Sequence, residues 1–95
     1  MGLLDILRRQ KTVDPDERRN RLLSQGRITD GVILDTHIDD AGNEVAHYLY
    51  TLNGVDFESV EVLTDTQRND PARYAPGASV AIRYDPKNQG NSILE

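Results

Sequence analysis

The stretch YLYTLNGVDF, residues 48–57, decides the fold of this chain because it predicts a tight β-hairpin. Asn53 and Gly54 both tolerate a positive φ, which favours a two-residue type I′ turn between antiparallel strands. The register set by this turn pairs Leu52 with Val55, Tyr50 with Phe57 and Tyr48 with Ser59. Tyr50 and Phe57 then form a cross-strand aromatic pair, which we expect on the core side of the sheet.

The second strand of this hairpin contains a conflict between register and hydrophobicity. The register, continued unchanged, places Glu61 inside and leaves Val60 and Val62 outside. Because valine is far more often buried than glutamate, we expect a β-bulge near Ser59 that turns both valines inward. Glu58 and Glu61 then act as exposed charges that discourage pairing at a sheet edge.

Alternating apolar residues predict further strands on both sides of the hairpin. A strand over residues 28–38 contains Gly31 at a bulge or bend and presents one apolar face, made of Ile28, Val32, Leu34 and Ile38. After the hairpin, one helical turn over residues 71–74, capped by Asp70, precedes a strand over residues 80–84. A turn over residues 87–90 leads to a short last strand over residues 92–94. These patterns predict a mainly β fold, a small, partly open antiparallel β-barrel or roll of about five strands with one or two short N-terminal helices.

The N-terminal part of the chain has helical signals instead. Asp14 is a good N-cap, Pro15 suits the first helical position, and Glu17 completes a capping box. Gly26 suits the left-handed position that ends many helices. We therefore divide the chain into a basic helical arm, residues 1–26, and an acidic β-barrel domain, residues 27–95.

Charge is divided unevenly between these two parts. Residues 1–27 carry seven basic and four acidic side chains, which gives +3, and residues 28–95 carry four basic and twelve acidic ones, which gives −8. The sum is the net charge of −5 of the 95-residue chain. An acidic body disfavours nucleic acid as a partner, because that affinity depends on neutralising phosphates.

A short amphipathic helix over residues 3–9 is the main candidate for an interaction site. Its residues are Leu3, Leu4, Ile6, Leu7, Arg8 and Arg9. A helix of this length is marginal in water and needs a surface to bind. That surface is an unknown protein partner, a second copy of the chain, the open end of its own barrel, or, with weak affinity, an anionic membrane. These possibilities indicate a cytoplasmic protein, or one that is peripheral to a membrane.

Known chemical motifs are few in this sequence. Asp35, His37 and His47 could share one outward face of the first hairpin and bind zinc or iron, although two solvent-facing histidines near an acid are the simpler interpretation. The spacing of Asp39, Asp40 and Asn43 does not match a calcium loop. The chain has no Cys, and no phosphate-binding loop, dinucleotide fingerprint or nucleophile elbow occurs. We therefore expect no enzyme and no cofactor.

Residues 74–86, YAPGASVAIRYDP, and the ending Ser92-Ile93-Leu94 form a pattern with the aromatic hairpin of residues 48–57. This pattern resembles a widespread bacterial family, the domain of unknown function thirty-five ninety-two, over about residues 27–94. The resemblance implies a small β-domain and supplies no functional residues. Members of that family often have flanking transmembrane helices, and this chain has no apolar run near the ~20 residues that such a helix needs.

The sequence as a whole indicates a non-enzymatic binding or interaction module, a β-domain docked or tethered through a basic amphipathic N-terminal helix. The first alternative is a peripheral membrane protein that uses the helix over residues 3–9. The second alternative is a metal-binding protein with a site at Asp35, His37 and His47.

Overall fold

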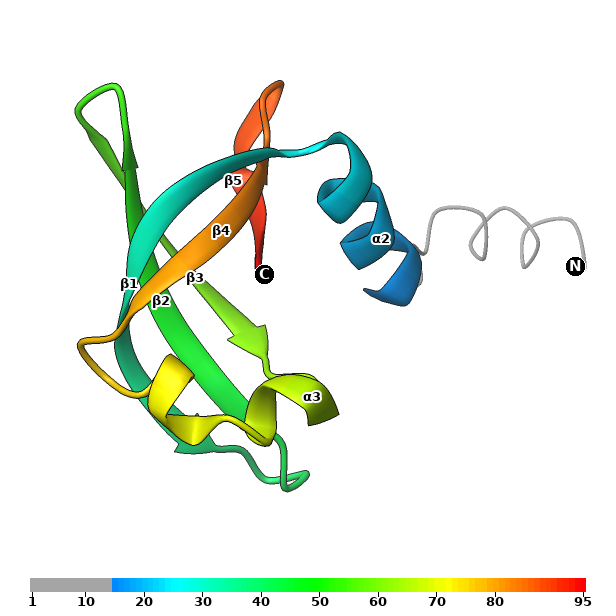
Figure 1. Ribbon diagram of the computed structural model, residues 1–95, viewed down its shortest axis with the longest axis vertical. Coiled ribbons are helices and arrows are strands. Elements are labelled where there is room, and N and C mark those ends of the chain that lie inside the picture. Colours follow the sequence, from blue (N-terminus) through cyan, green and yellow to red (C-terminus); the bar gives the residue numbers. More distant parts are fainter. Residues whose placement is uncertain (1–14) are drawn as a thin grey trace, which may run out of the picture.

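A computed structural model describes residues 15–95 of the chain, and five antiparallel strands curl there into a nearly closed barrel (Figure 1). The strands are β1 (Arg27–Ile38), β2 (Glu44–Leu52), β3 (Val55–Val62), β4 (Ser79–Asp85) and β5 (Asn88–Leu94). Their order in the sheet is β3-β2-β1-β4-β5, so β3 and β5 are the two edges. The predicted mainly β, partly open barrel is confirmed. With helical segments between β3 and β4, this connectivity is that of an OB-type barrel.

The β2–β3 hairpin forms as residues 48–57 predict. Asn53 has a φ of 52° and Gly54 a φ of 80°, as a type I′ turn requires. The three predicted cross-strand pairs are all present. The rings of Tyr50 and Phe57 stack with their centroids 5.3 Å apart.

The predicted bulge near Ser59 is wrong. β2 and β3 pair without interruption from Leu52–Val55 to Val45–Val62. Val60 and Val62 are therefore exposed, at 55% and 48% of their surface, while Glu61 turns inward. The register set by the turn prevails over side-chain hydrophobicity, because Glu61 finds hydrogen-bond donors inside the barrel.

β1 contains a bulge, and a second shift of register lies between Tyr84 and Asp85 of β4. The pairing of β1 with β2 shifts between Ile33 and Asp35, so Leu34 has no partner on β2. The predicted apolar face of β1 is wrong as a result of the true register: Ile33 is buried, whereas Ile28, Leu34 and Ile38 are exposed. A bulge of this kind increases the bend of a strand, which suits β1 because it pairs with β2 on one side and β4 on the other.

Two short helical elements connect β3 to β4, namely α3 (Asp65–Arg68) and the 3-10 helix η1 (Pro71–Tyr74). The predicted turn over residues 71–74 is confirmed, but the Asp70 side chain makes no capping hydrogen bond. α3 was not predicted, although Thr64 and Gln67 form the capping box that begins it. The β4–β5 turn lies at residues 86–87 rather than over 87–90, which makes β5 longer than predicted.

Helix α2 (Pro15–Gln25) packs outside β4 and β5 (Figure 1). Leu22 is its buried contact, and Glu17 pairs with Arg21 at 3.5 Å on its exposed side. Gly26 does not have the predicted left-handed conformation. It is needed for close approach instead, because a Cβ there would overlap Leu22 O and lie 3.1 Å from Tyr84 O.

The barrel interior is filled by residues of all five strands and of η1. Tyr48, Ile82 and Leu94 are fully buried, and Ile33 and Tyr50 are 1% exposed. Gly31 lies at the centre of β1, opposite both Tyr50 and Val80. A Cβ on Gly31 would overlap Ile82 Cδ1 and approach Leu49 O to 2.6 Å, so the barrel closes around a position that cannot carry a side chain.

We therefore expect Gly31→Ala to lower the free energy of unfolding by about 1–3 kcal/mol, as overpacking does in other cores. Urea denaturation measures the change. Gly90→Ala in β5 is the matched control, because nothing lies within 4 Å of its Cβ position. The control should stay within about 0.5 kcal/mol of the parent chain, and an equal loss in both variants would contradict this account.

Candidate interaction surface

The edge of β5 that faces β3 is bonded by side chains of helix α2. Arg18 Nη2 donates to Ser92 O at 2.8 Å, and its Nε donates to Asn91 Oδ1 at 3.0 Å. Arg19 Nη1 donates to Leu94 O at 2.8 Å. These guanidinium groups occupy the places that backbone N–H groups of a neighbouring strand would take, and they fix α2 to the barrel.

Glu61 and Gln67 bond the same edge of β5. We call the line along which β3 and β5 face each other the seam. Glu61 Oε2 accepts the backbone N–H of Leu94 at 3.2 Å and lies 3.4 Å from Arg19 Nη1. Gln67 Nε2 donates to Leu94 O at 3.1 Å and is itself buried. The backbone N–H and C=O of Leu94 therefore both have hydrogen-bond partners, and so does each buried side chain at the seam.

Burial raises the pKa of Glu61 from its ordinary 4.5 to about 7. The Leu94 N–H and the nearby guanidinium groups of Arg19 and Arg18 oppose this rise, but the loss of solvation is the larger effect. The carboxyl group at the seam therefore changes its charge near neutral pH.

Tyrosine hydroxyls tie the same terminal segment to the interior. Tyr48 Oη and Ser92 Oγ are 2.8 Å apart, and Tyr50 Oη donates to Gln89 O at 2.5 Å. Tyr74 Oη donates to Glu95 O at 3.0 Å. Burial raises the pKa of Tyr48, so its hydroxyl stays neutral at physiological pH. The terminal segment is thus bonded from inside as well as from outside.

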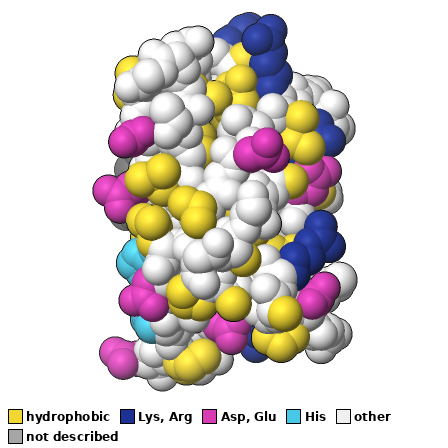
Figure 2. Space-filling view, turned by 60° about the vertical axis from the view of Figure 1, so that its left-hand side comes forward, with side chains coloured by type: hydrophobic (Ala, Val, Ile, Leu, Met, Phe, Trp, Pro, Cys, Tyr) yellow, Lys and Arg dark blue, Asp and Glu magenta, His cyan; other side chains and the backbone are white. Residues whose placement is uncertain are grey.

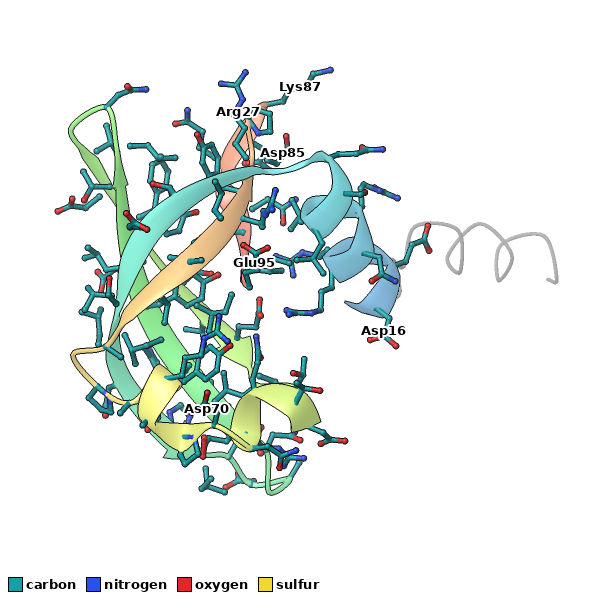
Figure 3. All side chains as sticks on the ribbon, viewed as in Figure 1. Asp16, Arg27, Asp70, Asp85, Lys87 and Glu95 are labelled. Atoms are coloured by element: carbon teal, nitrogen blue, oxygen red, sulfur yellow. The ribbon has the colours of Figure 1, made fainter. Side chains whose placement is uncertain are left out.

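Helix α2 also borders two shallow surface features. A groove of about 400 Å³ lies between α2 and β3 and is lined by the apolar residues Val60, Val62, Leu63 and Ile93. Asp16, at the first turn of α2, lies at its rim (Figure 3). A second pocket of about 280 Å³ lies between α2 and the β4–β5 turn, beside Asp85 and Lys87. Apolar surface is thus exposed where the N-terminal residues join the described structure.

The outer surface of β1, β2 and β3 is the other prominent feature, and we call it the acidic face. The chain has no Lys or Arg from Ile28 to Gln67 and has nine Asp and Glu there. The acids on this face include Asp30, Asp35, Asp56 and Glu58, and its exposed apolar residues include Ile28, Leu34 and Val60. Figure 2 shows acidic and hydrophobic side chains mixed on this side of the molecule, with the histidines at its border.

Two of the three residues of the predicted metal site are brought together on this face. His37 Nδ1 and His47 Nε2 are 3.3 Å apart, and their ring centroids are 5.1 Å apart. Asp35 is the cross-strand neighbour of His47, but its Oδ1 accepts the backbone N–H of Thr36 at 2.8 Å. Within residues 15–95, no group of three or more His, Asp or Glu side chains is arranged to hold a metal ion.

Asp39 serves the β1–β2 turn. Its Oδ1 accepts the N–H groups of Ala41 at 3.0 Å and of Asn43 at 2.8 Å, and the Asn43 N–H is the main reason that its pKa is lowered. Gly42 follows with a φ of 85°. This geometry is that of a hairpin turn, with no role for Asp39 in holding an ion.

The other predicted interaction residues lie outside the described residues. They are Leu3, Leu4, Ile6, Leu7, Arg8 and Arg9. Among residues 15–95, no helix is long and apolar enough to cross a membrane. The sequence analysis missed the seam residues Arg18, Arg19, Glu61 and Gln67. Two signals could have found half of them: the hairpin register for Glu61, and the Thr64–Gln67 capping-box spacing.

The raised pKa of Glu61 predicts a pH-dependent stability. Below about pH 4.5, Glu61 is protonated in both the folded and the unfolded chain. Between about pH 4.5 and pH 7 the unfolded chain ionises first, so the free energy of unfolding falls as pH rises, by up to about 3 kcal/mol. Glu61→Gln should remove this fall, measured by urea denaturation at about pH 5.5 and about pH 8.

Glu58→Gln is the control for this measurement, because Glu58 lies on the same strand but on the exposed face. It should keep the pH dependence of the parent chain. If Glu61→Gln and Glu58→Gln gave the same slope, the seam carboxyl would not be the titrating group.

Comparison with known proteins gives one result. No curated protein and no solved structure matches this chain. A family model, Domain of unknown function (DUF3592), matches residues 24–95, which confirms the resemblance drawn from residues 48–57 and 74–86. The matched segment contains all five strands and covers well over half of the sequence. The chain therefore belongs to the DUF3592 family, whose function is unknown.

Proposed function

We propose that this chain is a non-enzymatic interaction module whose basic N-terminal segment docks a rigid acidic barrel onto an acidic protein surface. The observation that carries the proposal is the division of charge. Residues 1–12 have three basic side chains and one acidic one, whereas residues 28–67 have nine acidic side chains and no basic one. The docking residues are Leu3, Leu4, Ile6, Leu7, Arg8 and Arg9.

The packing of the barrel supports this role for the N-terminal leucines. Tyr48, Tyr50, Ile82 and Leu94 already fill the interior, each at most 1% exposed. The core among the described residues is therefore complete without residues 3–7. Apolar side chains that are not needed for a core are available for an interface.

Helix α2 would make the docking rigid. Arg18 and Arg19 hold α2 on the β5 edge through bonds of 2.8 Å to Ser92 O and Leu94 O. The helix that follows the docking segment in the sequence is therefore held on the barrel.

A protein partner fits these charges better than a membrane or a nucleic acid. The −8 charge of residues 28–95 leaves only the basic N-terminal segment to contact anionic lipid or phosphates. OB-type barrels bind oligonucleotides on the face around β2 and β3, and no Lys or Arg occurs in those strands here. A basic, apolar segment calls for an acidic surface with exposed apolar side chains.

The acidic face of a second copy has this chemistry. Leu34 and Val60 are exposed there among Asp35, Asp56 and Glu58. We therefore assign the docking partner as a second copy, with residues 3–9 of each copy on the acidic face of the other. This reciprocal arrangement closes as a symmetric dimer and leaves no unpaired site.

Sedimentation equilibrium of the full chain tests this proposal. We expect a dimer at low salt that dissociates as salt screens the charges. Arg8→Glu with Arg9→Glu should weaken dimerisation by about tenfold or more, since charge pairs at interfaces contribute on this scale. The matched control is Arg73→Glu with Lys87→Glu, two exposed basic residues in η1 and the β4–β5 turn, which should leave the dimer intact.

A charge exchange makes the test specific for the proposed surface. The Arg8→Glu, Arg9→Glu chain mixed with an Asp56→Lys, Glu58→Lys chain should form a heterodimer, because the signs are again opposite. A chain that stays monomeric at all concentrations would overturn the proposal. So would equal weakening by the control pair, or cosedimentation with anionic vesicles in place of dimerisation.

A further inference from the structure

We propose that His37 and His47 form a zinc-binding site on the outer surface of the β1–β2 pair, with His37 Nδ1 and His47 Nε2 as the two protein ligands. The two nitrogens are 3.3 Å apart and lie on the same face of the sheet, where His37 is exposed and His47 is half-buried. Imidazole nitrogen is a preferred zinc ligand.

The separation of the two nitrogens matches tetrahedral coordination. With a zinc–nitrogen distance of about 2.0–2.1 Å, two ligands at a tetrahedral angle lie about 3.3–3.4 Å apart. Two ligands at a right angle, as in square-planar sites, would lie about 2.8–3.0 Å apart. The observed 3.3 Å, which is the length of the contact between the two rings without metal, places the nitrogens within reach of one tetrahedral ion. Two coordination positions remain for water or for a group from another molecule.

The contact between the two rings in the metal-free protein is compatible with zinc binding. The two rings face each other through one N–H···N contact, so one nitrogen carries a hydrogen and the other offers its lone pair. Zinc needs the lone pairs of both nitrogens. The donating ring therefore moves its proton to its other nitrogen, with no net release of a proton, and each ring rotates toward the ion.

The surrounding charge favours a cation at this place. Asp35 is the cross-strand neighbour of His47, and the turn carboxylate of Asp39 is close enough to His37 to interact with its charge. No Lys or Arg occurs between Ile28 and Gln67 to oppose a divalent ion. The supporting observations are thus independent: one is the distance between two nitrogens, and the other is the sign of the field around them.

The composition of the chain makes the test unusually direct. The sequence contains two His and no Cys, so imidazole coordination of zinc can come from this pair alone. The untagged full chain is titrated with zinc chloride by calorimetry, and the imidazole nitrogens are followed by NMR. We expect one zinc per chain, with the Nδ1 signal of His37 and the Nε2 signal of His47 shifting together. Magnesium, which prefers oxygen ligands, should not shift them.

The variants His37→Gln and His47→Gln should each weaken zinc binding about tenfold or more, because one of two protein ligands is lost. Asp40→Asn, an exposed acid in the adjoining turn, is the control and should bind zinc as the parent chain does. Thermal unfolding without zinc should be unchanged in both histidine variants, since neither ring belongs to the core.

Two outcomes would overturn the site: zinc that leaves the imidazole signals unshifted, or a His47→Gln chain that binds zinc as tightly as the parent. The zinc site does not use residues 1–14. Its failure is therefore distinguishable from a failure of the proposed dimer, which Arg8→Glu with Arg9→Glu tests separately.

Discussion

The backbone of the last strand has to be hydrogen-bonded on both of its edges, and the rest of the structure depends on how this is done. β5 pairs with β4 on one side, but β3 does not pair with it on the other. Both edge strands run in the same direction, as the alternation of the antiparallel sheet requires. Arg18, Arg19, Glu61 and Gln67 supply the missing donors and acceptor, because unpaired backbone groups at such a seam would be costly.

The bonding of β5 by side chains explains why Glu61 lies on the inner side of the barrel. Glu61 is a charged residue on the inner side of a strand whose valines point outward. An apolar side chain at position 61 would fill space, but it could not accept the Leu94 N–H. The exposed Val60 and Val62 are the consequence, since successive residues of a strand face opposite sides. They line the groove beside α2.

The same closure determines which surfaces are available for function. α2 covers the outer side of β4 and β5, so the exposed faces are those of β1, β2 and β3. These strands contain acidic side chains and both histidines but no basic group after Arg27. A docking surface for a basic segment and a site for a divalent cation therefore share one physical origin, which is a negative field that no nearby Lys or Arg offsets.

Much of the fold could be predicted because its signals are local. The Asn53-Gly54 turn, the Pro15 helix start and the strand alternation around Ile82 each depend on neighbouring residues, and the structure contains all three. The candidate site was harder to predict. His37 and His47 were proposed together from the hairpin, and they do meet. Arg18 and Arg19, by contrast, looked like ordinary surface residues of a short helix.

What the sequence by itself determined was the set of strands, the hairpin register and the division of charge, since turn chemistry and alternation act over a few residues. The tertiary structure alone decided that Glu61 belongs inside, that Leu34 forms the bulge and that α2 closes the barrel. Each of these depends on partners far away in the chain, such as Leu94 for Glu61 and Ser92 for Arg18. Their energies come from the pairing of buried polar groups, which no short stretch of sequence contains in full.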